Sequence, residues 1–169
     1  TIRPQEYLAA YLRGERADPS EEIARAMAKL LLARPDIQVV VVSRYGNAPR
    51  YRGIFGRKAK VTEGVVDGKS LIGLSTLFIG AGGTMTAEAA LQGVPTISIY
   101  PKSTVVEDYL VRNGLVVKAK GNLYELALER VHRTPRELKA LRRRAVGILD
   151  GMEDPAVRIA GAVEGLLRR

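Results

Sequence analysis

Residues 77–95 read LFIGAGGTMTAEAALQGVP, and this segment decides the fold. Its first three residues, Leu77 to Ile79, are typical of a strand buried on both faces. A glycine-rich turn follows and leads at once into a helix over Thr84 to Gln92, which Gly93 and Pro95 end. A strand, a glycine turn and a helix in direct succession predict an α/β domain with a parallel sheet.

The turn has the composition of an anion-binding site. Glycine at positions 80, 82 and 83 permits positive φ and lets a ligand approach the backbone closely. The free N–H groups of the first helical turn, together with the helix dipole, attract phosphate. We therefore predict that Gly82, Gly83 and Thr84 bind a diphosphate, with the Thr86 hydroxyl as a further donor.

Glu88 extends this prediction along the helix. It lies four residues after Thr84, on the same helix face. At 1.5 Å per residue it stands about 6 Å further along the axis. A carboxylate only accepts hydrogen bonds, and a ribose offers two neighbouring hydroxyl donors. The spacing predicts a ribose contact at Glu88, and the alternative is a solvated helix glutamate.

Two other glycine motifs are disfavoured. A dinucleotide fingerprint would need glycine where Met85 stands and an acidic residue about twenty positions after Gly80, where Tyr100 stands. The segment 64–70 resembles a phosphate-binding P-loop, but its glycine spacing is one residue short and no apolar strand precedes it. The sequence therefore argues against both dinucleotide binding and nucleotide hydrolysis.

Strand-like and helix-like segments alternate along the rest of the chain. Strands are expected at residues 1–3, 37–42, 60–62, 77–79, 96–100 and 115–118. Helices are expected over residues 5–12, 18–34, 67–74, 84–92, 104–113, 122–132, 136–149 and 155–168, with a long loop over 44–60. This pattern predicts a Rossmann-like, doubly wound parallel sheet of about six strands in the order 3-2-1-4-5-6, with a C-terminal helical tail.

Composition narrows the function classes. The 169 residues suffice for one α/β domain, with 46% hydrophobic residues and no apolar run long enough to span a membrane. The absence of cysteine and the presence of one histidine argue against a disulfide scaffold and a metal site, and a cytoplasmic protein is expected. The net charge of +9 fits either a nucleic-acid-binding surface or the arginine-rich surface of a thermostable protein, and interspersed charges favour the second.

Two arginines are candidates for the same site as the glycine turn. Arg3 and Arg44 each follow an expected strand. Ligands of open α/β sheets bind at the carboxyl ends of the strands, so both guanidiniums are predicted to neutralise the diphosphate. The alternative for each is an ordinary surface arginine.

The segment GAGGTMTAEAALQGVPTISIYP, residues 80–101, resembles the C-terminal-domain motif of GT-B glycosyltransferases and of the related UDP-N-acetylglucosamine 2-epimerases. The chain is also similar to the family called domain of unknown function 354. That second likeness rests on Arg3-Pro4, Arg44-Tyr45 and the segment from Val66 to Leu71.

The resemblance implies a two-domain enzyme of which residues 1–169 form a single nucleotide-sugar-binding domain. By this likeness the ligand is UDP or a UDP-sugar, Glu88 binds the ribose, and Gly64, Val65 and Val66 present backbone to the base. It implies that a separate N-terminal domain, absent from this chain, binds the acceptor and carries the catalytic base. No catalytic residue is assigned here, no metal or cofactor is expected, and the chain alone is expected to be inactive.

The sequence thus favours the donor-binding half of a glycosyltransferase or sugar epimerase. The acceptor of such an enzyme can lie at a membrane surface without the protein having a transmembrane segment. Two alternatives stay open, a basic nucleic-acid-binding module and a sugar-nucleotide-binding domain without catalysis. The 7 tyrosines and 2 phenylalanines form no RNA-binding signature, which argues against nucleic acid as the partner.

Overall fold

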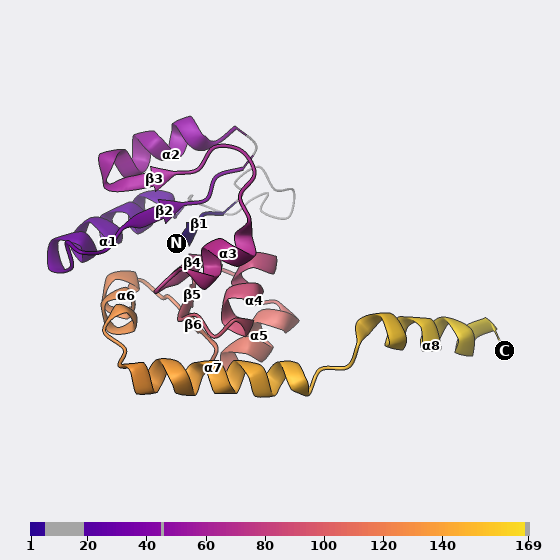
Figure 1. Cartoon of the computed structure of the whole chain (residues 1–169). Helices are drawn as coiled ribbons and strands as arrows, with labels where there is room; N and C mark the ends of the chain where they lie inside the picture. The colour runs from indigo at the N-terminus through magenta and orange to yellow at the C-terminus, as the bar shows by residue number, and fades with distance from the viewer. Residues whose placement is uncertain (6–18, 45, 168–169) are drawn as a thin grey trace.

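A computed structural model describes residues 1–5, 19–44 and 46–167. Six strands form one sheet in the order β3-β2-β1-β4-β5-β6, and every neighbouring pair is parallel (Figure 1). The strands are β1 (Ile2–Arg3), β2 (Val39–Val41), β3 (Ala59–Val61), β4 (Phe78–Gly80), β5 (Thr96–Ser98) and β6 (Val116–Lys118). This order confirms the doubly wound sheet predicted from the sequence. The helix expected over residues 5–12 lies, from residue 6 on, outside the described residues, as does Tyr45.

Helices cover both faces of the sheet. They are α1 (Ser20–Ala33), α2 (Ala48–Phe55), the 3-10 turn η2 (Gly56–Lys58), α3 (Gly68–Gly73), α4 (Thr84–Leu91), α5 (Val105–Arg112), α6 (Leu123–Val131), α7 (Pro135–Asp150) and α8 (Pro155–Leu167). Residues of α1, α2 and α6 share one core cluster, whereas α3, α4, α5 and α7 contribute to clusters on the opposite face. Successive side chains of β4 point to opposite faces of the sheet. Ile79 belongs to the cluster with α1, α2 and α6, and Phe78 belongs to a cluster on the opposite face.

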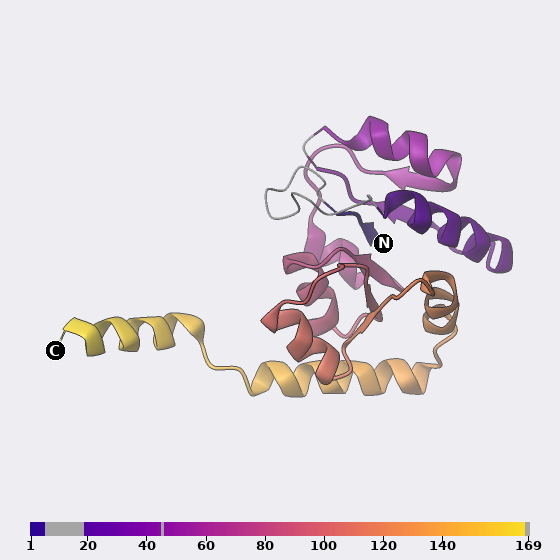
Figure 2. The same ribbon diagram turned by 180° about the vertical axis from the view of Figure 1, so that it is seen from behind.

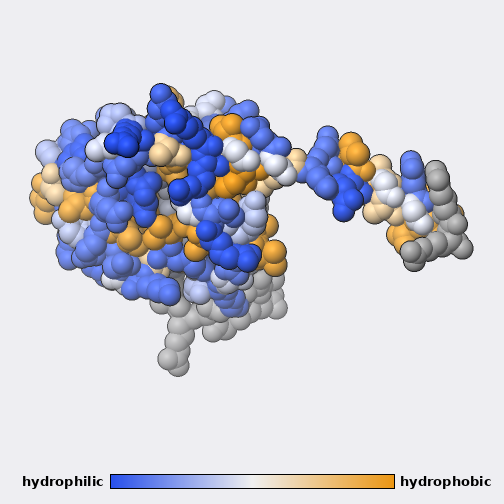
Figure 3. Space-filling view, turned by 90° about the horizontal axis from the view of Figure 1, so that it is seen from below, coloured by the Kyte–Doolittle hydropathy of each residue, from blue (hydrophilic) through white to orange (hydrophobic). Residues whose placement is uncertain are grey.

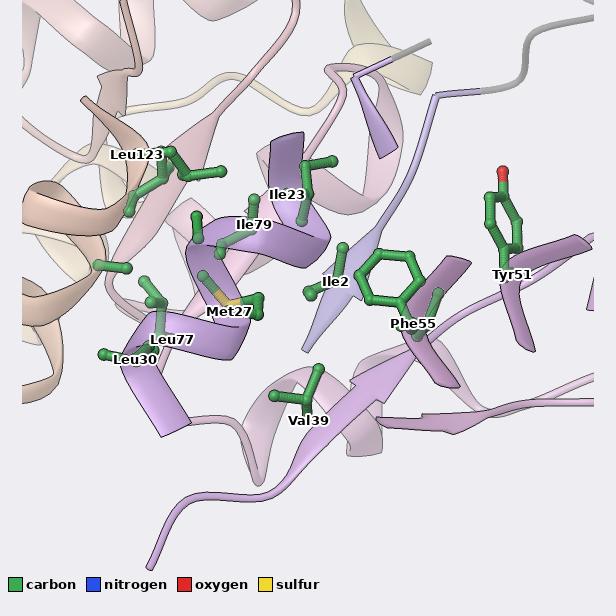
Figure 4. Packing of buried hydrophobic residues seen from close by; sticks show 14 residues of the cluster. Ile2, Ile23, Met27, Leu30, Val39, Tyr51, Phe55, Leu77, Ile79 and Leu123 are labelled. Carbon is green, nitrogen blue, oxygen red and sulfur yellow. The ribbon is translucent and has the colours of Figure 1, made fainter. Parts of the chain in front are cut away.

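The larger core cluster lies between the sheet and α1. Figure 4 shows Ile23 and Met27 of α1 near Ile2 and Ile79 of the central strands, with Leu30 further along α1 in the same cluster. All five side chains are almost fully buried. Apolar residues at spacings of three and four along α1 pack against β-branched residues of the strands. This packing holds α1 on the sheet whose carboxyl edge carries the candidate site.

One expected loop is a helix. Residues 44–60 contain α2 and η2. Tyr51 and Phe55 lie one helical turn apart and pack edge to face with ring centroids separated by 6.5 Å. Tyr51 is 1% exposed, and its hydroxyl donates to the backbone carbonyl of Gln5 at 3.3 Å. The prediction of a loop was wrong because the glycines of this segment argue against a helix, although Tyr51 and Phe55 have the spacing of an apolar helix face.

The expected C-terminal helical tail is present as α7 and α8. Helix α7 packs against α4, whereas α8 extends away from the sheet in both views (Figures 1 and 2) and its residues 155–167 are exposed. Hydrophilic side chains predominate on the face of the domain drawn in Figure 3, with apolar side chains in smaller groups among them, and both kinds occur along α8. Among the described residues, no helix is both long and apolar enough to cross a bilayer.

Candidate functional site

The glycine turn follows β4 at the carboxyl edge of the sheet. Its start is fixed by the neighbouring strand, because the Ala81 N–H donates to the carbonyl of Arg3 at 3.2 Å. Gly82 and Gly83 have φ of +78° and +76°, values at which residues with a Cβ are strained. Gly80 is restricted by space instead, since a Cβ there would overlap the Thr86 hydroxyl.

The first turn of α4 is open to a ligand. Gly83 is the N-cap residue, with ψ of −167°, and supplies no side-chain cap. The first N–H groups of a helix have no acceptor within the helix, and Ala87 is the first residue whose N–H donates back, to Gly83 at 3.2 Å. Thr84 at the start of this turn is exposed. The turn therefore presents backbone donors and the positive end of the helix dipole to solvent.

Thr86 has a different role from the one expected. Its side chain is buried, and its hydroxyl donates to the carbonyl of Gly82 at 3.0 Å. The hydroxyl proton is thus used to hold the turn. The prediction that Thr86 adds a donor for the ligand is wrong for this conformation, and Thr86 stabilises the positive-φ glycines instead.

A pocket of about 760 Å³ reaches α4 at Met85, the residue that follows Thr84. It joins three parts of the chain, the end of β2 with the start of α2, the loop after β3, and Met85 of α4. Its lining includes Arg44 and the three residues expected to face a base, Gly64, Val65 and Val66. The structure therefore brings the predicted base-binding loop and one predicted arginine into the same pocket.

The end of this loop is fixed by the N-cap of α3. Asp67 accepts a hydrogen bond from the Lys69 N–H at 3.2 Å and another from the Ser70 hydroxyl. The Ser70 hydroxyl is the main reason that the pKa of Asp67 lies below its usual value. Asp67 thus positions the loop and makes no contribution to the pocket itself.

Glu88 lies on the exposed surface of α4. It follows Met85 by three residues, so the two side chains share a helix face and Glu88 lies beside the pocket that Met85 lines. Within the described part of the chain, no hydrogen bond or ion pair of its carboxylate is found. The geometry leaves this carboxylate available to a ligand, and the ribose contact stays a prediction.

The two arginines differ in accessibility. Arg44 is exposed at the pocket. Arg3 is 8% exposed, and its guanidinium donates to the carbonyl of Val42 at 3.1 Å, across the ends of β1 and β2. Its contact with the diphosphate also stays a prediction, but the structure gives Arg3 a bracing role at the strand ends as well.

A second pocket, of about 480 Å³, lies between α4 and α5. Gly82, Gly83 and Thr84 form one wall, and Thr104, Val106 and Leu110 form the other. Among residues 1–5, 19–44 and 46–167, no group of three or more histidine, aspartate or glutamate side chains is placed to hold a metal ion.

Sequence reasoning missed a buried polar cluster behind this second pocket. It consists of Ser98 at the end of β5, Glu107 in the first turn of α5 and Lys118 at the end of β6. The pattern of Thr104 and Glu107, three residues apart, is typical of a capping box. Half of the box forms, since the Glu107 N–H donates to the Thr104 hydroxyl at 3.1 Å, but the Glu107 carboxylate points into the domain instead.

Comparison with known protein families identifies the family of this chain. The family described as "Protein of unknown function (DUF354)" matches residues 1–156. The chain belongs to this family. Over 99 residues it is 33% identical to the uncharacterized protein MJ0665 of Methanocaldococcus jannaschii, an overlap of 57% of this chain and 28% of that protein.

Solved structures with sugar-related names have the same fold. A putative UDP-N-acetylglucosamine 2-epimerase from Listeria monocytogenes aligns with a TM-score of 0.63 and 19% identity, over 85% of this chain and 38% of its own. A Thermobaculum terrenum O-GlcNAc transferase mutant aligns with a TM-score of 0.57 and 20% identity, over 87% and 33%. This member of the family thus spans well under half of the length of each of these three proteins, and at these identities the likeness to the solved structures concerns the fold.

Proposed function

We propose that this chain binds a UDP-linked sugar and is the donor-binding half of a glycosyltransferase or sugar epimerase. The observation that carries the proposal is the open glycine turn, Gly82 to Thr84, which lines one pocket and leads directly into Met85 of the other. The pocket at Met85 is also lined by the loop Gly64 to Val66, and the pocket at the turn is also lined by α5. An extended ligand with a base, a central diphosphate and a sugar fits this order of sites.

Each part of the ligand has a matching group in the structure. The diphosphate would accept hydrogen bonds from the backbone N–H groups at the start of α4, where the dipole favours negative charge. The exposed guanidinium of Arg44 would supply a charge-assisted contact. The base would enter the pocket beside Val65 and Val66, and Glu88 would accept from both ribose hydroxyls.

The same groups suit the chemistry of a nucleotide leaving group. Breaking the bond between the anomeric carbon and the diphosphate places the electron pair and added negative charge on the departing phosphate oxygen. Fixed N–H dipoles and a guanidinium aimed at that oxygen stabilise this charge. We further propose that a second domain supplies the acceptor and the catalytic base. The similar epimerase and transferase structures have chains more than twice as long as this one, which supports the presence of such a domain.

Calorimetric titration with UDP, UMP, uridine and a single-stranded RNA tests the proposal. UDP should bind more tightly than UMP, and UMP more tightly than uridine, because the second phosphate gains the contacts at the turn. Binding of RNA with no measurable binding of UDP would instead favour the nucleic-acid module that the charge of +9 permits.

A pair of glycine variants makes the test specific to the turn. Gly83→Ala introduces a Cβ at φ +76° with ψ −167°, a backbone region open almost only to glycine, so the turn should rearrange and UDP affinity should fall. Gly121→Ala is the matched control, because Gly121 also has positive φ, +78°, and free space around it but lines neither pocket. If Gly83→Ala and Gly121→Ala bind UDP with equal affinity, the glycine turn is not part of the UDP site.

A further inference from the structure

The polar cluster of buried Ser98 and Glu107 and half-buried Lys118 lies beside the glycine turn. Ser98 is fully buried and Glu107 is 5% exposed. A carboxylate removed from water to this degree is costly unless it is paired and hydrogen-bonded. The three residues come from β5, α5 and β6, so the cluster joins elements at the carboxyl edge of the sheet where the candidate site lies.

Both oxygens of the Glu107 carboxylate are occupied. The Ser98 hydroxyl donates to Oε1, and the Lys118 ammonium donates to Oε2 at 3.0 Å. The same ammonium also donates to the backbone carbonyl of Lys102, in the loop between β5 and α5. The Glu107 carboxylate is therefore held by groups of the domain itself.

A continuous set of contacts leads from this cluster to the glycine turn. The Ser98 hydroxyl oxygen accepts a hydrogen bond from the Tyr100 N–H at 3.2 Å. The Tyr100 ring in turn lies against Gly82, where an added Cβ would stand 3.1 Å from the ring carbon Cγ. The ring thus supports the first positive-φ residue of the turn from behind.

We propose that Glu107 and Lys118 are positioning residues which hold the loop 99–104 and the Tyr100 ring against Gly82, and so keep the turn ready to bind a diphosphate. The identity of the ligand rests on the proposed function, whereas the effect on the turn does not. In the low dielectric of the interior the ion pair is strong, and removal of one partner leaves the other buried and uncompensated. The loop would then move to admit water, and the ring would leave Gly82.

The test compares variants of the whole chain by NMR and by UDP titration. Lys118→Met should shift the amide resonances of Gly82 and Gly83 and weaken UDP binding about tenfold, while Lys118→Arg, which keeps the cation, should restore both. Arg34→Met is the control, because it breaks the ion pair of Arg34 with Asp36, remote from both pockets at the turn. It should leave the turn resonances unchanged.

A second variant keeps the proposal testable if Lys118→Met does not fold. Tyr100→Ala removes the ring from Gly82 without touching Glu107 or Lys118, and it should weaken UDP binding as Lys118→Met does. Folded variants with a lower melting temperature but with unchanged Gly82 and Gly83 resonances would show a purely structural role and overturn the proposal. If the wild-type chain fails to bind UDP while Lys118→Met still shifts the Gly82 and Gly83 resonances, the proposed ligand is overturned and the positioning role stands.

Discussion

Replacement of Glu88 by alanine separates the possible functions of this chain. The side chain is exposed on α4, and no partner of its carboxylate is found among the described residues. Its removal therefore breaks no contact within the domain, and alanine is the best helix former. The free energy of unfolding should change by less than about 0.5 kcal/mol, as for surface substitutions away from special features.

The effect on ligand binding should be much larger. Hydrogen bonds that involve a charged group contribute about 1.5–3 kcal/mol. Loss of the ribose contact should therefore raise the dissociation constant for UDP roughly 10- to 150-fold, at 1.4 kcal/mol per factor of ten. The 2′,3′-dideoxy analogue of UDP should bind weakly to the wild type and lose little more affinity in the variant.

Isothermal titration of both proteins with both ligands gives the answer. Glu125→Ala is the matched control, since Glu125 is also an exposed helix glutamate and its loss changes the net charge equally. A nucleic-acid-binding module predicts unchanged or slightly tighter RNA binding in Glu88→Ala, because a repulsive carboxylate has been removed. Equal UDP affinities of wild type, Glu88→Ala and Glu125→Ala would refute the role of Glu88.

Three further predictions concern the scaffold. Gly80→Ala should destabilise the domain by about 1–3 kcal/mol, because the new Cβ overlaps the Thr86 hydroxyl, and chemical denaturation measures this. Thr134→Ala removes the capping box of α7 and should cost about 1 kcal/mol, a fall in melting temperature of roughly 2–4 °C by calorimetry. The Ser70 hydrogen bond lowers the pKa of Asp67, so the stabilisation by this cap is present at neutral pH and is lost as pH falls through the folded-state pKa. Melting temperatures of wild type and Asp67→Asn should therefore converge below about pH 4, near the pKa of an unperturbed aspartate, and a constant difference down to pH 2 would contradict this.

The central sheet could be predicted from the sequence because its signals are local. Two segments predict buried strands directly, the apolar run before Gly80 and the β-branched run from Val39 to Val41. Because parallel strands are joined by right-handed connections, few sheet topologies are then possible. Helix α2 was missed because three glycines within residues 46–56 outweigh the apolar pair of Tyr51 and Phe55, whose burial depends on tertiary packing.

The candidate site was predictable only where backbone forms it. The turn at Gly82 and Gly83 follows from glycine chemistry, and both residues have the positive φ that glycine permits. The inward use of the Thr86 hydroxyl and the pairing of Glu107 with Lys118 depend on side-chain directions across different elements. No spacing within one segment encodes such contacts.

A crystal structure of the chain with UDP tests the central claim most directly. The account predicts phosphate oxygens about 2.7–3.2 Å from the backbone nitrogens of Gly83 and Thr84, the uracil beside Gly64 to Val66, and the ribose hydroxyls on Glu88. Clear density for UDP at any other place, with the glycine turn empty, would contradict it.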